Sequence, residues 1–251
     1  MESTKIPGSC VVLYSGGMDS TVVLHHALKK YDQIRAISFD YDQRHRQELD
    51  VARNYLLKLK YKNRSNFNIE HYEINLSAIG RTLTSSSLTN RNLTVPKMKD
   101  VIGDPQTSTY VPNRNMMFLS IAASMAESLN ADTVLYGAAK ADDTSGYWDC
   151  TQEFRSLLNQ LLSLNRRNLI QIETPLIEMD KKQIIEYGLE LGVDFAETHT
   201  CYNSFDVYEN EKACGECPSC SARIAGWIQA GKIDPVPYNR HIDWQKYNCV
   251  A

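Results

Sequence analysis

Apolar positions along the chain follow two alternating patterns. Short runs in which apolar residues are continuous or alternate with polar ones predict β-strands, and they cover residues 10–15, 34–41, 67–76, 133–139 and 169–176. Stretches in which apolar residues recur every three or four positions predict amphipathic helices, and they cover residues 19–30, 47–61, 114–129, 152–164 and 181–191. Because the two patterns alternate, we expect a Rossmann-like α/β fold, a parallel sheet with helices on both faces.

Two regions interrupt this alternation. Residues 82–112 are rich in Ser and Thr and contain three prolines. A long segment without regular structure in a compact domain is often a lid over a binding site, and disorder is the alternative. Residues 198–251 hold most of the cysteines. We therefore predict an α/β domain over 1–197, with a lid at 82–112, and a small C-terminal subdomain over 198–251.

The composition restricts the class of protein. The chain has 251 residues, of which 43% are hydrophobic, enough for a full core. Its formal net charge is −3, so no basic field argues for direct binding to nucleic acid. The N-terminal MESTKIPGSC has no apolar run like that of a signal peptide, and no stretch approaches the roughly 18 apolar residues of a membrane span. We expect a cytoplasmic protein with no membrane partner.

Seven cysteines are present, an odd number that does not suit a secreted disulfide framework. Cys214, Cys217 and Cys220 follow a C-x2-C-x2-C spacing, and Cys201 lies upstream. Four thiolates form a common shell for a tetrahedral, structural Zn²⁺ because they leave no coordination position open. An iron–sulfur cluster and redox-active thiols are the alternatives. We predict a structural zinc site that attaches the tail to the domain.

The stretch VVLYSGGMDSTVVL, residues 11–24, carries the clearest chemistry. Gly16 and Gly17, between a predicted strand and a predicted helix, allow main-chain N–H groups to approach a ligand closely. A helix N-terminus favours an anion, and two serines add hydroxyl donors. The carboxylate of Asp19 suits an anion site only with a cation, and Mg²⁺ accompanies phosphates. The stretch predicts a pyrophosphate cradle; a plain turn capped by Asp19 and Ser20 is the alternative.

The string SGGMDS after a first strand resembles the SGGxDS signature of the pyrophosphatase-loop ATP enzymes, whose fold is adenine nucleotide alpha hydrolase-like. Members of that superfamily use ATP to adenylate a carbonyl or amide oxygen with release of pyrophosphate, and a nucleophile then displaces AMP. The resemblance implies ATP and Mg²⁺ as ligands. It also implies an ATP-binding loop that comprises Tyr14, Ser15, Gly16, Gly17, Met18, Asp19, Ser20 and Thr21.

Further strings narrow the resemblance to one family. They are DYDQRH, YVPNRNMMFLSIAASMAE, ADDTSGYWDC, and HTCYN together with ACGECPSC. With the glycine loop they resemble the 7-cyano-7-deazaguanine synthase family. The resemblance implies that 7-carboxy-7-deazaguanine is adenylated, that ammonia gives the amide, and that a second adenylation with loss of AMP gives the nitrile. It also implies a homodimer and places the family's structural zinc on Cys201, Cys214, Cys217 and Cys220.

The same motifs supply the candidate site residues. Besides Asp19 and Ser20, the resemblance favours Arg114 and Asp143 as catalytic residues that contact phosphate or substrate or transfer a proton. Each residue also has a structural alternative. Arg114 could form a salt bridge or cap a helix, and the acids at 142 and 143 could be solvated in a loop. His45 could be a surface histidine, and Tyr147 could pack in the core. The predicted substrate contacts are Arg44, His45, Asn115, Asp142, Ser145, Gly146 and Tyr147.

The chain departs from the family pattern at several positions. The family usually has glycine at Asp42, proline at Trp148 and tryptophan at His199. Because these positions neighbour the predicted substrate, a second hypothesis is a paralogous ligase that adenylates the deazaguanine carboxylate and passes the acyl group to another amine, for example on a protein partner. A tRNA sulfur-transfer enzyme and a nucleotide-binding module without catalysis are the remaining alternatives.

Overall fold

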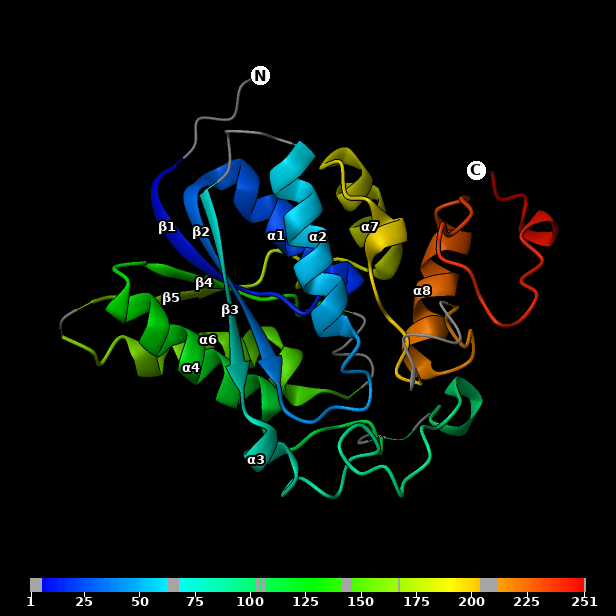
Figure 1. The fold of residues 1–251 in the computed structure, drawn as a ribbon, viewed down its shortest axis with the longest axis horizontal. Helices are drawn as coiled ribbons and strands as arrows, with labels where there is room; N and C mark the ends of the chain where they lie inside the picture. The colour runs from blue at the N-terminus through cyan, green and yellow to red at the C-terminus, as the bar shows by residue number, and fades with distance from the viewer. Residues whose placement is uncertain are drawn as a thin grey trace.

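The computed structural model describes residues 6–62, 68–102, 104, 107–140, 146–166, 168–203 and 212–250. Its centre is a parallel sheet of five strands in the order β3-β2-β1-β4-β5 (Figure 1). The strands are β1 (Ile6–Leu13), β2 (Tyr31–Asp40), β3 (Asn68–Asn75), β4 (Thr133–Leu135) and β5 (Gln171–Glu173). The helices are α1 (Met18–Lys30), α2 (Glu48–Lys62), α3 (Ser77–Gly80), α4 (Arg114–Ser128), α6 (Gln152–Leu162), α7 (Lys181–Glu190) and α8 (Pro218–Gln229).

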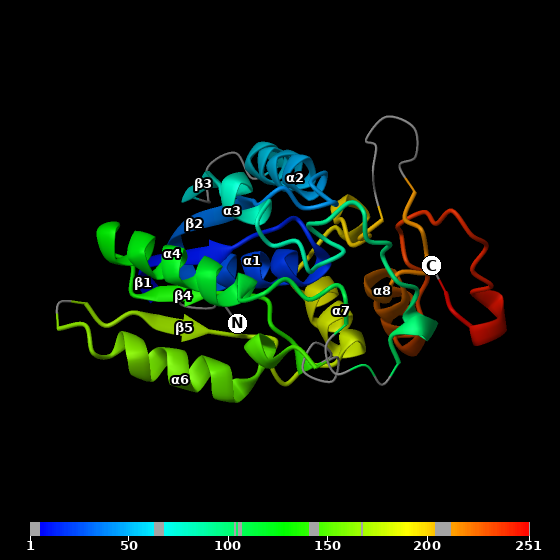
Figure 2. The same ribbon diagram turned by 90° about the horizontal axis from the view of Figure 1, so that it is seen from below.

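The central strand β1 separates two hydrophobic cores because successive side chains of a strand point to opposite faces. Val12 lies in the core that includes α1, α2 and α7, and Val11 lies in the core that includes α4 and α6. Both valines are fully buried. The turned view in Figure 2 shows α2 and α6 on opposite sides of the sheet. The predicted α/β fold with helices on both faces is confirmed.

Strands β4 and β5 are shorter than the apolar pattern predicts. β4 ends at Leu135, although Tyr136 and Ala139 beyond it are also buried. The chain leaves the sheet at Gly137 and passes close to α1, since a Cβ at Gly137 would lie 3.3 Å from the Ser20 nitrogen. The buried residues beyond the strand therefore pack around the β1–α1 loop instead of extending the sheet.

The described part of segment 82–112 is a series of packed turns. Ser86, Ser87 and Leu88 are almost fully buried. Farther along, the Met98 nitrogen donates a hydrogen bond of 3.1 Å to the Glu216 carbonyl oxygen in the C-terminal region. Figure 1 shows the segment running from α3 toward α8. Disorder is the wrong alternative for these residues, whereas their action as a lid stays a prediction.

A buried ion pair joins α8 to the chain that follows it. Arg223 Nε and Nη2 lie 2.7 and 2.9 Å from the Asp234 carboxylate, and the two side chains are 1% and 0% exposed. Arg223 also donates to the Phe195 carbonyl oxygen at 3.0 Å. The predicted boundary at residues 197 and 198 lies just after Phe195, where the chain packs against α8. The division into domains stays a prediction.

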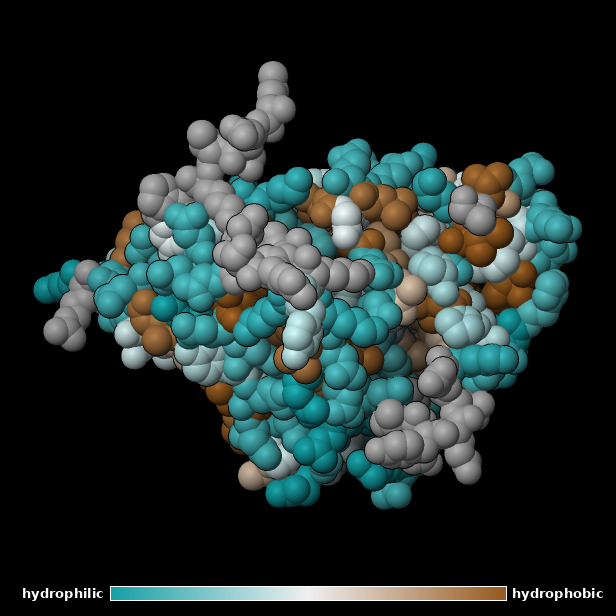
Figure 3. Space-filling view, turned by 45° about the horizontal axis from the view of Figure 1, so that its top comes forward, coloured by the Kyte–Doolittle hydropathy of each residue, from teal (hydrophilic) through white to brown (hydrophobic). Residues whose placement is uncertain are grey.

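The surface has several exposed apolar side chains. Leu157, Leu161 and Leu164 are 56, 62 and 74% exposed, on one side of α6 and just after its end. On the face drawn in Figure 3, apolar residues form separate patches among hydrophilic ones. No helix in the described ranges has the length and apolar character needed to cross a membrane.

Candidate functional site

The loop between β1 and α1 takes its shape from Gly16. Its φ angle is 80°, a left-handed conformation that favours glycine. A Cβ there would lie 2.8 Å from the Ala52 nitrogen and 2.8 Å from the Glu48 carbonyl oxygen. The backbone of α2 therefore lies directly against the loop, and a side chain at position 16 would force the two apart.

Hydroxyl groups hold the loop in one conformation. Ser15 Oγ lies 3.1 Å from Ser20 Oγ and accepts a hydrogen bond of 3.2 Å from the Gly17 nitrogen. Ser20 Oγ and Thr21 Oγ1 lie 3.1 and 2.8 Å from the Gly17 carbonyl oxygen, to which both donate. Gly17 is the N-cap of α1, and no side chain caps the helix. The N-cap glycine supplies no side-chain acceptor, so N–H groups at the start of α1 are available to an anion, while Ser20 also stabilises the turn.

Asp19 has a cationic partner from another helix. Lys181 Nζ, at the first residue of α7, lies 2.9 Å from Oδ2 and 3.0 Å from Oδ1 of Asp19. The lysine side chain is 12% exposed and the aspartate 27%. The carboxylate thus lies beside the helix N-terminus together with a positive charge, the condition under which an acidic residue suits an anion site.

The loop faces a cavity of about 700 Å³ at the carboxyl edge of the sheet. Open α/β sheets bind their ligands at this edge, and a cavity of this size accommodates a small molecule. The loop side is lined by Tyr14, Ser15, Gly17, Met18, Asp19 and Ser20. The rim includes His45, Glu48, Arg114, Asn115, Gly146, Tyr147, Asp149 and His199.

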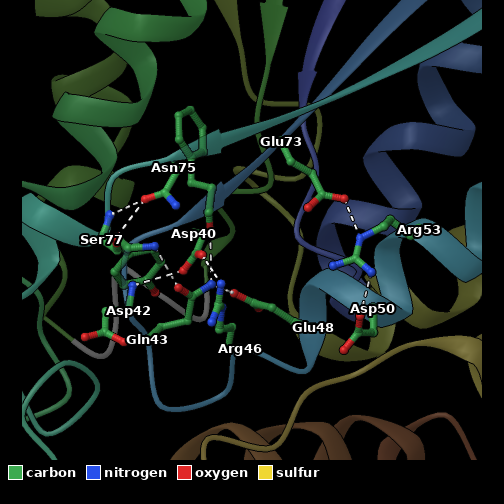
Figure 4. A network of polar contacts seen from close by, with 12 residues as sticks. Asp40, Asp42, Gln43, Arg46, Glu48, Asp50, Arg53, Glu73, Asn75 and Ser77 are labelled. Carbon is green, nitrogen blue, oxygen red and sulfur yellow. Dashed lines mark hydrogen bonds and ion pairs between the residues drawn. The ribbon is translucent and has the colours of Figure 1, made fainter.

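Glu48, at the start of α2, is a buried carboxyl that faces the cavity. Its side chain is 13% exposed, and burial raises its pKa to about 7 against the opposing effects of Gln43 and Arg114. Gln43 Nε2 donates to Glu48 Oε1 at 3.0 Å (Figure 4). Because this carboxyl titrates near neutral pH, it can accept and release a proton there.

His45 presents a neutral imidazole beside this carboxyl. Its Nε2 lies 3.6 Å from Glu48 Oε1, and the residue is 5% exposed. Burial, with His199 and Arg114 nearby, lowers the pKa of His45 to about 3. Its Nδ1 atom is buried and makes no hydrogen bond with the described residues.

Arg114 brings a buried positive charge to the start of α4. Burial alone would lower the pKa of Arg114, but Tyr41 and Tyr202 beside it raise that pKa, so the guanidinium stays charged. Asp149 is 3% exposed, and burial raises its pKa although the charge of Arg114 opposes the shift. A guanidinium and a carboxyl in one cavity can bind an anionic group and N–H donors of the same ligand.

Most predicted site residues that the structure describes line this cavity, but Gly16, Thr21 and Arg44 do not. Gly16 packs against α2 and Thr21 donates to the Gly17 carbonyl oxygen, so both stabilise the loop without lining the cavity. The Nε and Nη2 atoms of Arg44 donate to main-chain carbonyls of segment 82–112 at 3.0, 3.2 and 2.6 Å, and its substrate contact stays a prediction. The predicted residues that lie outside the described ranges are Asp142, Asp143 and Ser145.

Two of the three named departures from the family pattern lie away from the cavity. Asp42 adopts a φ of 60°, the left-handed conformation that glycine favours. Trp148 is 43% exposed, and its Nε1 donates to the Tyr110 hydroxyl at 2.9 Å. His199 does line the cavity, and its main-chain nitrogen donates to the Gly16 carbonyl oxygen at 2.9 Å. Of these three positions, therefore, His199 is the one that lines the cavity.

Three of the charged residues that line the cavity and were not predicted are Glu48, Lys181 and Asp149. Glu48 and Lys181 are the first residues of α2 and α7, and Asp149 lies in the short turn before α6. All three follow connections from the carboxyl ends of strands, where ligands of such sheets bind. Their position at or just before the start of a predicted helix is the sequence signal that would have identified them.

The four predicted zinc ligands meet at one point. The Sγ atoms of Cys201, Cys214, Cys217 and Cys220 all lie within 4.8 Å of one another. Zinc–thiolate bonds of about 2.3 Å in a tetrahedron place the sulfur atoms roughly 3.8 Å apart, and the Cys214–Cys220 distance is 3.9 Å. The donor set therefore fits one zinc ion, and the short distances favour it over a larger iron–sulfur cluster.

Relatives of known name match nearly the whole chain. The family model described as "Queuosine biosynthesis protein QueC" matches residues 9–231. The 7-cyano-7-deazaguanine synthase 1 of Colwellia psychrerythraea is 38% identical over 228 residues, 91% of this chain and 97% of that protein. The 7-cyano-7-deazaguanine synthase of Geobacter sp. strain M21 is 40% identical over 235 residues, 92% of this chain and 97% of that protein. Among solved structures, a 4-thiouridine synthetase–RNA complex with bound ATP has a TM-score of 0.44 at 20% identity, over 83% of this chain and 44% of that chain.

Proposed function

The chain belongs to the family of the queuosine biosynthesis protein QueC, and on that premise we propose that it is an ATP-dependent, AMP-forming ligase. It converts 7-carboxy-7-deazaguanine and ammonia into 7-cyano-7-deazaguanine. The curated relatives that match 91% and 92% of this chain carry the name 7-cyano-7-deazaguanine synthase, which supports this substrate and product.

One observation carries the proposal. The uncapped N-terminus of α1 and Asp19 face the same cavity as the buried polar groups of the rim. The pyrophosphate end of ATP and the substrate carboxylate can therefore bind in one cavity. Transfer of the AMP group requires this proximity, because the carboxylate oxygen must reach the α-phosphorus.

The proposed reaction has two activation steps. In the first, a carboxylate oxygen attacks the α-phosphorus of ATP and pyrophosphate leaves; ammonia then attacks the acyl carbon, AMP leaves, and loss of one proton gives the amide. In the second, the amide oxygen attacks the α-phosphorus of another ATP and pyrophosphate leaves. Loss of both N–H protons and of AMP then gives the nitrile. Adenylation serves each step because AMP is a far better leaving group than an oxide ion.

In the ATP half of the site, main-chain N–H groups at the start of α1 bind the pyrophosphate end of ATP, and Ser15 and Ser20 act as further donors. Asp19 is the proposed ligand of Mg²⁺, which offsets phosphate charge when bound. The fit of Asp19 to a cation rests on its partly buried carboxylate, which accepts both contacts from the Lys181 ammonium.

In the substrate half, the charged Arg114 binds the carboxylate, and Asp149 accepts N–H donors of the purine-like ring. Asn115, Gly146 and Tyr147 border the same space. The roles of Asp142, Asp143 and Ser145 stay predictions.

Four protons must leave nitrogen in the reaction, one of them as the amide forms, and Glu48 is the proposed acceptor. Ammonium must lose a proton before it can attack, and the nitrile forms only when the amide nitrogen loses two. A carboxyl with a pKa of about 7 is close to the optimum for a general base at neutral pH. The neutral His45 beside it offers a route for the proton toward the cavity.

The remaining parts of the proposal concern assembly. The four-cysteine site holds a structural zinc ion, because four thiolates leave no position open for a substrate. The homodimer implied by the family and the cytoplasmic location stay predictions.

Product identification tests the proposed function. The purified protein is incubated with Mg-ATP, ¹⁵N-ammonium and 7-carboxy-7-deazaguanine, and the products are identified by mass spectrometry. We expect a nitrile that carries ¹⁵N, with two AMP released for each nitrile. Asp19→Asn is the matched variant, expected to form no nitrile while it keeps its zinc and its circular dichroism spectrum. An acyl-adenylate or amide that accumulates without nitrile would contradict the proposal and favour transfer to another amine.

A further inference from the structure

Three hydroxyl groups of the cavity wall form a cluster of hydrogen bonds. Thr107 Oγ1 lies 2.6 Å from Thr109 Oγ1, which lies 2.7 Å from the Tyr147 hydroxyl. The Tyr147 hydroxyl and Thr107 Oγ1 are 3.4 Å apart. Thr107 and Thr109 are 8% and 2% exposed, and all three residues line the cavity. These three residues are called the hydroxyl cluster below.

The backbone of segment 82–112 holds the two threonines of the cluster. The Tyr110 nitrogen donates to the Thr107 carbonyl oxygen at 2.9 Å and closes a turn. Inside this turn, the Ser108 carbonyl oxygen accepts from the buried Ser87, at 2.7 Å from its nitrogen and at 3.1 Å from its Oγ. The backbone that carries the threonines is therefore held in place, while their O–H bonds can still rotate.

The surroundings do not fix the direction of the hydrogen bonds within the cluster. In each bond either hydroxyl can be the donor, and within the described ranges the three hydroxyls make no hydrogen bond outside the cluster. If Thr107 donates to Thr109 and Thr109 donates to Tyr147, the Tyr147 O–H can donate into the cavity. If the direction is reversed, Tyr147 donates to Thr109 and presents only lone pairs to the cavity. The cluster can therefore change from donor to acceptor by rotation of O–H bonds alone.

The proposed reaction requires such a change, because one cavity must bind two different acyl groups. The carboxylate offers only acceptor atoms, whereas the amide that replaces it has an NH₂ group that donates. Two other polar groups of the wall have fixed roles. The Arg114 guanidinium can only donate. The Tyr110 hydroxyl already accepts from Asn113 N at 3.2 Å and from Trp148 Nε1 at 2.9 Å, which leaves it the role of a donor.

We propose that the hydroxyl cluster binds the acyl group of both substrates. It donates to the carboxylate in the first activation and, with its hydrogen bonds reversed, accepts from the NH₂ group of the amide in the second. Tyr147 contacts the substrate, and Thr109 is a positioning residue that acts through Tyr147. This inference rests on the proposed function, because it requires the carboxylate and the amide to bind in turn.

The two bound states depend differently on Thr109. When Tyr147 donates to the carboxylate, its proton needs no partner within the protein. When Tyr147 accepts from the amide, its own proton must go to Thr109, since an O–H left unpaired away from water is costly. Removal of the Thr109 hydroxyl should therefore weaken binding of the amide and spare binding of the carboxylate.

The test measures binding of 7-carboxy-7-deazaguanine and of its amide to the full chain by calorimetry. The analogue Mg-α,β-methylene-ATP, which cannot transfer AMP, is present throughout. For Thr109→Val we expect the amide to bind about tenfold more weakly and the carboxylate to bind within about twofold of the wild type. For Tyr147→Phe we expect both compounds to bind about tenfold more weakly. Nitrile formation from added amide and Mg-ATP should fall in both variants.

Thr174→Val is the matched control for the loss of a buried threonine hydroxyl. Thr174 is 4% exposed, its Oγ1 makes no hydrogen bond with the described residues, and it does not line the cavity. This variant should bind both compounds like the wild type. Thr109→Ser keeps the hydroxyl and should retain amide binding within about threefold. The two variants separate the effect of the hydroxyl from that of side-chain packing.

Equal weakening of both compounds in Thr109→Val, or no weakening of either, would contradict the inference. Should this variant fail to fold, Tyr147→Phe provides the test, and binding of the amide at the wild-type affinity would be the contrary result. If the wild type binds both compounds without forming nitrile, and Thr109→Val still weakens only the amide, the proposed function is wrong and the role of the cluster stands. If the wild type binds neither compound, both proposals fail.

Discussion

Glu48 is a carboxyl that the fold keeps close to the balance between its charged and neutral forms. Desolvation raises its pKa from 4.5 to about 7, and the Gln43 hydrogen bond and the Arg114 charge, which favour the ionised form, limit the rise. Between these two pH values the folded protein binds the proton more tightly than the unfolded chain does. Stability from this group is therefore complete below about pH 4.5 and is lost as the pH rises through about 7.

We predict that Glu48→Gln lowers amide formation by about 100-fold and raises stability above pH 7. A general base must be ionised, so the wild-type rate should rise with pH through about 7, and the variant should lose that dependence. The neutral glutamine avoids the loss of stability described above, so its free energy of unfolding should exceed that of the wild type by about 1–3 kcal/mol at pH 8. Mass spectrometry and urea unfolding at pH 5 and pH 8 measure the two effects.

The control for this prediction is Glu190→Gln, a change at an exposed carboxyl near the end of α7. It should leave both the rate and the unfolding free energy unchanged. A Glu48→Gln variant with wild-type rates would remove Glu48 from the proton path. A variant less stable than the wild type above pH 7 would show that ionised Glu48 stabilises the fold.

The sequence could predict residues whose chemistry lies in one short motif, but not those whose role depends on contacts with distant parts of the chain. Ser15 and Asp19 belong to one short motif, and the structure places both at the cavity. Lys181 meets Asp19 across 162 positions of sequence, and no local pattern contains that pair. Arg44 shows the converse: its residue type suits a ligand, but main-chain carbonyls take all three of its described hydrogen bonds.

At the scale of elements, apolar periodicity located most helices well. The predictions 114–129 and 181–191 agree with α4 and α7 to within one residue at each end. α8 was not predicted, because its buried side is formed by Cys220, Arg223, Gly226 and Trp227. Of these four residues only Trp227 is a large apolar side chain, so apolar periodicity alone does not mark this helix.

The contact between the loop and α2 leads to a prediction for Gly16→Ala, with Gly192→Ala as its control. Both glycines have positive φ angles, 80° and 76°, so alanine should cost about 1 kcal/mol at either position through backbone strain. At Gly16 the new Cβ would also lie 2.8 Å from two backbone atoms of α2, whereas nothing lies within 4 Å at Gly192. We expect a further loss of about 1–3 kcal/mol and loss of Mg-α,β-methylene-ATP binding for Gly16→Ala alone.

Urea unfolding and calorimetry measure this pair of variants. If both are equally stable and both bind the analogue, then α2 can move away from the loop without cost, and the close packing at Gly16 does not shape the site.

At the scale of the whole molecule, the segment after α7 couples the cysteine cluster to the loop. The His199 nitrogen donates to the Gly16 carbonyl oxygen at 2.9 Å, and Cys201 follows two residues later in the cluster. A single parallel β-bridge between Gly17 and His199 holds this segment beside the loop. Periodicity predicts which face of a strand is buried but not which strands are neighbours, so this coupling could not be derived from the sequence.

We therefore predict that Cys217→Ala loses its zinc and also binds Mg-α,β-methylene-ATP about tenfold more weakly, an indirect effect at a residue remote from the phosphates. Loss of the ion frees Cys201, which loosens the His199 hydrogen bond that positions the loop. Cys249→Ala is the matched control, because Cys249 is also buried but lies outside the cluster. Metal analysis and calorimetry, at a temperature where circular dichroism shows the sheet intact, measure both quantities. A zinc-free variant that binds the analogue like the wild type would show that the metal stabilises only the tail.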